Sequence, residues 1–301
     1  MLSRRPASAR PRERIELLVV GALTIDRFRD GTAAPGGSVL HSARAAARAH
    51  AAITVVTAAG PEPEAQQGLR ELRDIATVVL EEVPQTLVFV HDEADGRRRL
   101  KLLGTVRLRP DVRQLQRLRP RAMLLAPVAG ELDPTALGMI DEAVEARVRV
   151  ATLQGWLRRR EADGRVTPSA LGDLTQAVLA GLRNCDVVIV SHEDLGRDES
   201  EPDPAATMDV RRWLPGPGVL VTWGEAGYVR ADAEAREPSV VHRRALIEGA
   251  STVGAGDAFA AIVAIQLAKG ASLAVAARAA DAAVEHWLAR QPGAVRIPTE
   301  R

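Results

Sequence analysis

Short apolar runs alternate with longer amphipathic segments along most of this chain. The apolar runs, rich in Val, Ile and Leu, predict buried strands at 16–21, 53–57, 76–80, 122–126, 148–152, 186–190 and 219–222. Helical periodicity between and after them predicts helices at 38–50, 62–74, 134–146, 168–183, 204–214 and 258–269. Near-continuous apolar strands that alternate with helices are typical of a mostly parallel sheet covered by helices on both faces. The pattern therefore predicts an α/β fold.

One segment departs from this alternation of strand and helix. Two β-prone runs, 86–91 and 97–103, flank the turn signal Asp95-Gly96 with no helix between them. We expect a small antiparallel flap here. The exposed edges of such a flap offer a possible homodimer contact.

Composition narrows the class of protein. The 301 residues are 46% hydrophobic, which is enough for one large domain, expected over 15–298. The 40 basic and 39 acidic residues nearly cancel, so nothing points to nucleic acid or a membrane as a partner. The single Cys185 excludes an intrachain disulfide, and residues 1–14 read as a disordered basic tail without a secretory apolar segment. We expect a cytoplasmic protein.

The most informative stretch is Gly249 to Phe259, GASTVGAGDAF, which packs small residues around the carboxylate of Asp257 just before a helical pattern. Such a loop leaves backbone N–H groups free at the positive end of a helix dipole, where a phosphate binds. A carboxylate would repel that phosphate, unless Asp257 takes a proton from a hydroxyl that attacks phosphorus. By itself, the stretch fits equally well an ordinary turn with Asp as a helix cap.

Other polar and small residues gather at the expected carboxyl ends of the strands, where ligands bind in such sheets. Taken singly, each has an ordinary alternative: Asp26 as a cap, Gly36-Gly37 as a tight turn, and the segment 222–227 as a hairpin turn. Since only Lys101 and Lys269 are lysines, a positive charge beside a phosphate is expected from Arg or a metal.

In combination and in this order, the segments resemble the signatures of the PfkB, or ribokinase-like, family of small-molecule kinases, from about Val20 to Gly293. Gly21 to Asp26 is similar to the family's first strand with its substrate-binding aspartate, and Pro35-Gly36-Gly37 to its di-glycine signature. The segment TWGEAG, 222–227, resembles its nucleotide-binding T-x-G-x-x-G, and TVGAGD, 252–257, its DTxGAGD signature.

The resemblance implies a fold, a set of roles and a donor. It implies a three-layer ribokinase-like sandwich with a β lid at about 22–35 and 84–105, and ATP with Mg²⁺ as cofactors. Asp257 would be the general base, with the N–H groups of Gly254, Ala255 and Gly256 as the anion hole. The implied substrate contacts are Asp26, Gly36, Gly37, His41 and Gln154, and the implied nucleotide contacts are Thr222, Gly224, Gly227 and Thr252.

Three positions depart from the family pattern. Ser251 replaces the leading Asp of DTxGAGD, a carboxylate that helps to bind a monovalent cation, so a potassium requirement stays undecided. The family's N-x-x-E appears as Ser191-His-Glu-Asp194, in which Asp194 keeps an oxygen ligand suited to Mg²⁺. His41 stands where an Asn is common, and both a substrate contact and a structural role remain open. We expect His192 to lie in a solvated turn rather than to act in catalysis.

The substrate is the least determined part. The segment Thr152 to Arg158, TLQGWLR, is similar to the Q-G-x-x-R element of inositol-kinase-like members of the family. The sequence therefore favours an ATP-dependent kinase of a small polyol or sugar, with a myo-inositol-like cyclitol as the acceptor. Two alternatives stay open: a ribose or nucleoside kinase, and a non-catalytic ligand-binding member of the family.

Overall fold

A computed structural model describes residues 16–94, 97–197, 200–243 and 245–298. The expected basic tail at 1–14 and the Asp95-Gly96 turn lie outside these residues.

The core of the fold is a central sheet in the order β15-β14-β13-β12-β9-β8-β1-β4-β5. The pairs from β13 through β12, β9, β8, β1 and β4 to β5 are parallel, and β14 and β15 extend the sheet antiparallel. This confirms the predicted mostly parallel sheet. The strands are β1 (Glu16–Val20), β4 (Ala52–Ala59), β5 (Thr77–Glu82), β8 (Ala122–Leu125), β9 (Val148–Thr152), β12 (Val187–Ser191), β13 (Gly218–Thr222), β14 (Gly227–Ala231) and β15 (Ser239–His242).

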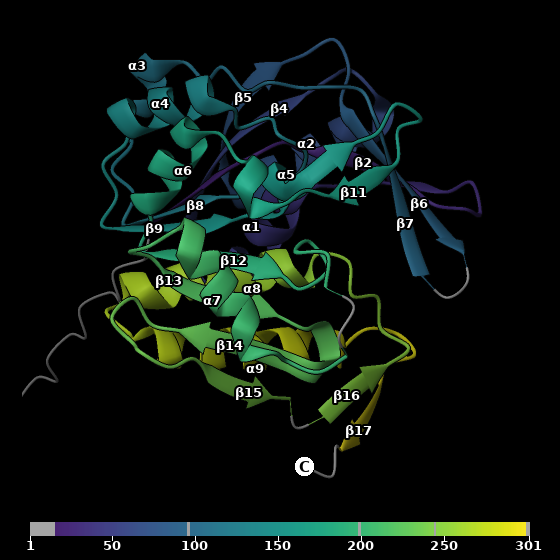
Figure 1. The fold of residues 1–301 in the computed structure, drawn as a ribbon. Helices are drawn as coiled ribbons and strands as arrows, with labels where there is room; N and C mark the ends of the chain where they lie inside the picture. Colours follow the sequence, from purple (N-terminus) through teal and green to yellow (C-terminus); the bar gives the residue numbers. More distant parts are fainter. Residues whose placement is uncertain (1–15, 95–96, 198–199, 244, 299–301) are drawn as a thin grey trace, which may run out of the picture.

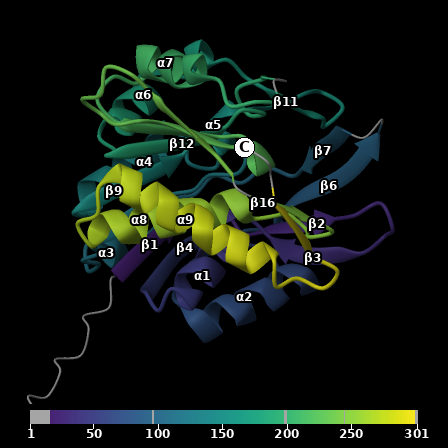
Figure 2. The same ribbon diagram turned by 90° about the horizontal axis from the view of Figure 1, so that it is seen from below.

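Helices cover both faces of this sheet. Figure 2 shows α1 (Ser38–Arg48), α2 (Pro63–Ile75), α8 (Ala255–Ala268) and α9 (Leu273–Leu288) on one side of it. The other side carries α4 (Pro134–Ala143), α6 (Gln176–Arg183) and α7 (Pro204–Trp213), and two short helices complete the set, α3 (Val112–Leu115) and α5 (Gln154–Leu157).

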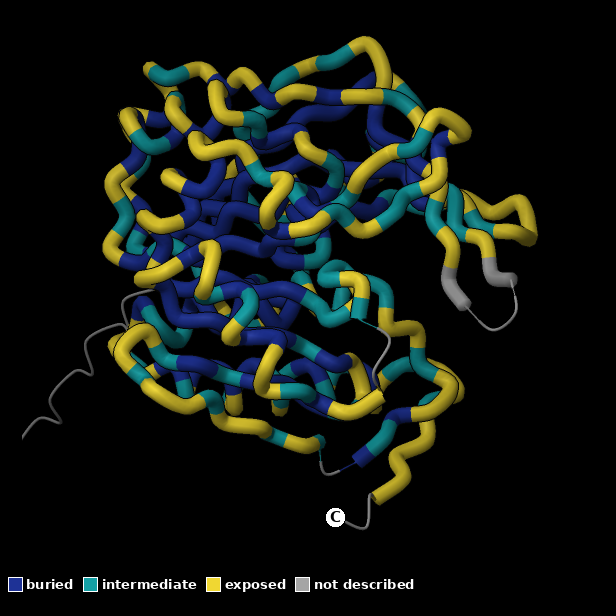
Figure 3. Tube along the Cα trace, viewed as in Figure 1, coloured by how far each residue is buried: buried dark blue, intermediate teal, exposed yellow. Residues whose placement is uncertain are grey.

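The strands are apolar at every position because alternate side chains enter the two different cores. In β1, Leu17 and Val19 pack with α1 and α8, whereas Leu18 and Val20 pack with the opposite layer. The helix α8 is apolar almost all round, since it lies between the sheet, α1 and α9. Figure 3 shows the buried segments concentrated in the central strands.

A second sheet projects from this body (Figure 1). Its order is β3-β2-β6-β7, from β2 (Thr24–Arg27), β3 (Ala33–Gly36), β6 (Leu87–Ala94) and β7 (Arg97–Leu103). The strands β2 and β6 pair in parallel, and the other two pairs are antiparallel. We call it the lid sheet. Two small hairpins, β10 (Arg158–Arg160) with β11 (Val166–Pro168) and β16 (Ala245–Glu248) with β17 (Val295–Pro298), complete the strands.

Two predicted helix starts were wrong. The helix expected at 168–183 begins only at Gln176, after the Thr175 hydroxyl that caps it, because 166–168 pairs with β10 and 171–173 forms a 3₁₀ turn. The helix expected from Ala258 begins at Ala255, so Asp257 lies inside its first turn.

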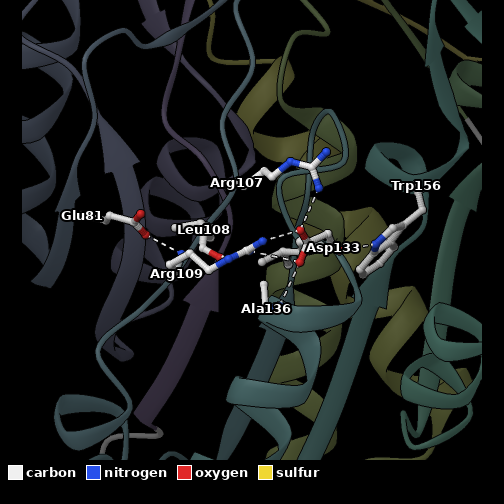
Figure 4. A network of polar contacts seen from close by, with 8 residues as sticks. Glu81, Arg107, Leu108, Arg109, Asp133, Ala136 and Trp156 are labelled. Carbon is white, nitrogen blue, oxygen red and sulfur yellow. Dashed lines mark hydrogen bonds and ion pairs between the residues drawn. The ribbon is translucent and has the colours of Figure 1, made fainter.

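A polar network holds the chain between β7 and α4 (Figure 4). The Asp133 carboxylate caps α4 by accepting the Ala136 N–H, and it also accepts hydrogen bonds from Arg107 and Arg109. The Trp156 indole donates to the Leu132 carbonyl at 2.7 Å. The network therefore ties the segment before α4 to α5, which carries Gln154.

Candidate active site

The GAGD loop, residues 252–257, follows β16 and includes the first turn of α8. Gly254 is the N-cap and has a left-handed backbone with φ of 80°. A Cβ at Gly254 would collide with the His41 ring, which packs directly against the loop. The Ala255 N–H donates to the Thr252 carbonyl at 3.0 Å, so of the three amides assigned to an anion, this one already has a partner.

The Asp257 carboxylate is the chemical centre of the site. The Gln154 side-chain amide donates to Asp257 Oδ1 at 3.2 Å and to Ser38 Oγ at 2.6 Å. Burial raises the pKa of Asp257 above its ordinary value, although His41, Ser38, Arg158 and Gln154 oppose the shift. Burial lowers the pKa of His41, although the nearby Asp257 carboxylate opposes this shift. The result is a half-buried carboxylate whose proton affinity suits a base.

Asp26 lies on strand β2 of the lid sheet itself and is buried, with 7% exposure. Its carboxylate packs so closely on Gly36 that a Cβ there would collide with it, which explains a glycine at this position. His91 of β6 reaches Asp26 Oδ1 with Nε2 at 3.2 Å and stacks on Phe28. Sequence analysis missed His91, because nothing in an exposed-looking hairpin indicates that one of its side chains turns toward Asp26.

Two cavities meet at the GAGD loop. The larger, of about 560 Å³, brings together the four predicted nucleotide contacts, Thr222, Gly224, Gly227 and Thr252, with Ala255 and Gly256. The smaller, of about 430 Å³, is lined by Asp26, His41, Val253 and Gly254, with Phe28 and Trp287. The loop therefore forms part of the wall of both cavities, and the residues on either side of Asp257 line one each, Gly256 the larger and Ala258 the smaller.

His192 is not simply solvated, which corrects our expectation. Its ring stacks on the Trp223 indole, with centroids 5.4 Å apart and planes 9° apart, and it lines the larger cavity. Asp194, two residues later, is paired with Arg158 at 3.3 Å, and its N–H donates to Ser191 Oγ. The predicted Mg²⁺ ligand therefore already has a cationic partner.

The loop after β8 rests on a buried carboxylate that sequence analysis did not single out. Glu131 is fully buried and accepts the N–H groups of Ala22, Val128 and Ala129. Burial raises the pKa of Glu131, and these amides oppose that shift. Glu131 thus joins the turn after β1, which leads to Asp26, to the loop whose Val128 carbonyl accepts from Arg158.

Among the residues that the structure describes, no three metal-ligating side chains come together. A Mg²⁺ ion commonly uses one or two carboxylates, water and the phosphates of its nucleotide, and Asp194 fits that mode. Within the same residues, no helix has the length and apolar character needed to cross a membrane.

A model of the pfkB family carbohydrate kinases matches residues 17–285, nearly the whole described chain. The chain belongs to this family. The family match, the central sheet and the lid sheet confirm the ribokinase-like fold that the motifs indicated.

Solved structures share this fold over almost their full length. A pyrophosphate-dependent kinase in the ribokinase family, complexed with a pyrophosphate analog and myo-inositol, is 19% identical with a TM-score of 0.72, covering 92% of this chain and 96% of that one. Fructokinase from Vibrio cholerae, bound to fructose, ADP and potassium, is 20% identical with a TM-score of 0.69, covering 94% and 95%. A ribokinase-type protein from E. coli with ATP and Mg²⁺ is 15% identical with a TM-score of 0.67, covering 92% and 94%. No curated protein matches the chain.

Proposed function

We propose that this pfkB family member is an ATP-dependent kinase that transfers the γ-phosphoryl group to a hydroxyl of a small polyol or sugar, with a myo-inositol-like cyclitol as the favoured acceptor. One observation carries the proposal: the GAGD loop lines two cavities at once, and the two chain neighbours of Asp257 line one each, Gly256 the larger and Ala258 the smaller. A phosphoryl donor in one cavity and an acceptor in the other would meet at this carboxylate.

The chemistry follows from that position. Asp257 takes the proton of the acceptor hydroxyl, whose oxygen forms a bond to the γ-phosphorus while the bond from phosphorus to the β–γ bridging oxygen breaks and ADP leaves. The N-terminal amides of α8 and its dipole stabilise the negative charge on the phosphoryl oxygens. The lid sheet, whose strand β2 carries Asp26, excludes water that would otherwise take the phosphoryl group.

The acceptor is proposed to lie in the smaller cavity and against Gln154. Asp26, His41 and Gln154 can bond several hydroxyls, which suits a polyol better than a base or an aromatic ring. The similarity of TLQGWLR to the element of inositol-kinase-like members supports a cyclitol, as does the solved relative that holds myo-inositol. Ribose or a nucleoside is the alternative acceptor, and a ligand-binding protein without turnover is the alternative function.

The larger cavity favours a nucleotide as the donor over bare pyrophosphate, the donor of one solved relative. Apolar side chains line part of it: Leu246, Phe259, Val284 and Leu288. It also carries four carboxylates, Glu193, Glu201, Glu225 and Asp281, and its Arg243 is bound to Asp281 at 2.7 Å. Such a surface suits an uncharged base, whereas a pocket for pyrophosphate alone needs an excess of positive charge.

Cations enter the proposal to different degrees. Asp194 would hold a Mg²⁺ that arrives with the nucleotide, and the ion would neutralise part of the phosphate charge. A monovalent cation is not part of the proposal. Ser251 lacks a carboxylate, and the Gln291 side chain bonds both its backbone N–H, at 2.8 Å, and its carbonyl, at 2.9 Å.

The test is a panel of cyclitols, pentoses, hexoses and nucleosides, each assayed with ATP and with pyrophosphate, for the wild type and Asp257→Asn. We expect ATP-dependent phosphorylation of a cyclitol that Asp257→Asn abolishes while nucleotide binding persists. Turnover retained by Asp257→Asn would rule out the assigned base. Nucleotide and polyol binding without any turnover by the wild type would favour the non-catalytic alternative.

A further inference from the structure

One side of α1 carries two arginines into the smaller cavity. His41, Arg44 and Arg48 follow one another at intervals of three and four residues, so they lie along the same side of the helix, and all three line this cavity. At the helical rise of about 1.5 Å per residue, Arg48 lies roughly 10 Å along the axis from His41. The cavity therefore has one end at the GAGD loop, where His41 packs on Gly254, and a basic end further along α1.

Both guanidinium groups are held by neighbouring helices. Glu71 of α2 accepts hydrogen bonds from Arg44 Nε at 2.6 Å and from Nη2 at 2.7 Å, and no described residue accepts one from Nη1. The Arg48 guanidinium lies over the Trp287 indole of α9, 5.9 Å from the ring centroid, and no carboxylate in the described part of the chain pairs with it. Arg48 is exposed, so the basic end of the cavity opens to solvent. Both arginines are thus oriented in advance and keep donors for a ligand.

The charge of the smaller cavity differs from that of the larger one. Its lining has two guanidinium groups and one carboxylate, that of Asp26, which His91 contacts. The larger cavity instead has four carboxylates in its lining, and its Arg243 is bound to Asp281. An uncharged polyol has no group that matches an unpaired guanidinium, whereas a phosphate or a carboxylate accepts two of its hydrogen bonds at once. The excess of positive charge therefore favours an acceptor with an anionic group.

We propose that Arg44 and Arg48 form an anion subsite in the smaller cavity, and that the acceptor is a polyol that already carries a phosphate ester or a carboxylate. The inference rests on the proposed function, because it places the acceptor hydroxyl at Asp257. The hydroxyl that is phosphorylated and the anionic group then lie at opposite ends of the acceptor, and the anionic group lies at the exposed end of the cavity. This group takes no part in the transfer and keeps its charge, so the subsite contributes to binding and to the choice of acceptor.

The experiment compares uncharged acceptors with their anionic derivatives: myo-inositol with inositol monophosphate, and glucose with glucose 6-phosphate and glucuronate. Steady-state kinetics with ATP give kcat and KM for the wild type, Arg48→Gln, Arg48→Lys and Arg44→Gln. Arg70→Gln of α2 is the matched control, because Arg70 is exposed and lines neither cavity. We expect the wild type and Arg70→Gln to prefer an anionic derivative over its uncharged parent by at least about tenfold in kcat/KM. Arg48→Gln should raise the KM for that derivative about 10- to 100-fold, and Arg48→Lys should lie between.

Thermal-shift titrations with the same compounds, without ATP, measure binding independently of turnover. The subsite is refuted if the wild type uses and binds each uncharged parent as well as its anionic derivatives, or if both Arg48→Gln and Arg44→Gln keep the full preference. A preference for the phosphates alone, or for glucuronate alone, supports the subsite and identifies the group that it takes. If no acceptor is phosphorylated but an anionic derivative still binds in a way that depends on Arg48, the proposed kinase function fails and the anion subsite stands.

Discussion

Asp133 offers a stability prediction whose size follows from the network in Figure 4. Burial acts to raise the pKa of Asp133, but hydrogen bonds from Arg109, the Ala136 N–H and Arg107 outweigh it and lower the pKa from 3.8 to about 2. At about 1.4 kcal/mol per pKa unit, this corresponds to at most about 2.5 kcal/mol of folding free energy at neutral pH. Arg107 is 72% exposed and Arg109 37%, so solvent screening reduces the expected value to about 1 kcal/mol.

The substitution Asp133→Asn isolates this charge, because Asn still caps α4 while the two ion pairs are lost. Urea unfolding followed by tryptophan fluorescence should show a loss of about 1 kcal/mol at pH 7. The native pKa is lowered, so the contribution is complete above pH 3.8 and disappears as the pH falls through about 2. The difference between wild type and Asp133→Asn should therefore stay constant from pH 7 to 5 and shrink below pH 4.

Asp163→Asn is the control, because Asp163 is 52% exposed and its partner Arg165 is 60% exposed. We expect no measurable change in its unfolding midpoint. The reasoning is refuted if Asp133→Asn unfolds at the wild-type urea concentration at pH 7. It is also refuted if the full loss persists at pH 2.5, since the lost interaction would then not be the carboxylate's charge.

Three further outcomes follow from the site. Gly254→Ala should cost about 1–2 kcal/mol of stability because its backbone is left-handed, and it should lower kcat by displacing His41. Gly256→Ala, which has open space around it, should unfold like the wild type. Equal melting temperatures for Gly254→Ala and Gly256→Ala would contradict this. Because the pKa of Asp257 is raised above 3.8, kcat/KM should fall on the acid side of the pH profile at a pH above 3.8. A kcat/KM that stays constant down to pH 4 would argue against Asp257 as the base. His91→Gln should raise the KM for the acceptor about tenfold and leave the KM for the donor unchanged, because His91 contacts Asp26 on the acceptor side only; equal changes in both would show that it acts on the lid as a whole.

Local sequence was most informative where one physical cause dominates. The apolar strands were predictable because a parallel strand buried on both faces needs an apolar residue at every position, as in β1. The helix expected at 168–183 was wrong in its first half, because the pairing of 166–168 with β10 is a long-range choice that helical periodicity does not record.

The candidate site shows the same division. The small residues of the GAGD loop and its acid are adjacent in the chain, so sequence could assign them a common role. Arg158 ends the TLQGWLR segment that the sequence analysis quoted, but nothing in that segment indicates its partner, and His91 stands in a segment with no chemical signal of its own. Only the fold brings Arg158 to Asp194, 36 residues away, and His91 to Asp26.

By itself, therefore, the sequence determined the alternation of strands and helices, the family signatures and the acid at the start of α8, because each depends on residues close together in the chain. The tertiary structure alone decided which charges meet. It set the contacts of Asp257 with Gln154, of Arg158 with Asp194 and of His41 with Gly254, because these depend on how the sheet order and the packing of α1, α5 and α8 place distant segments side by side.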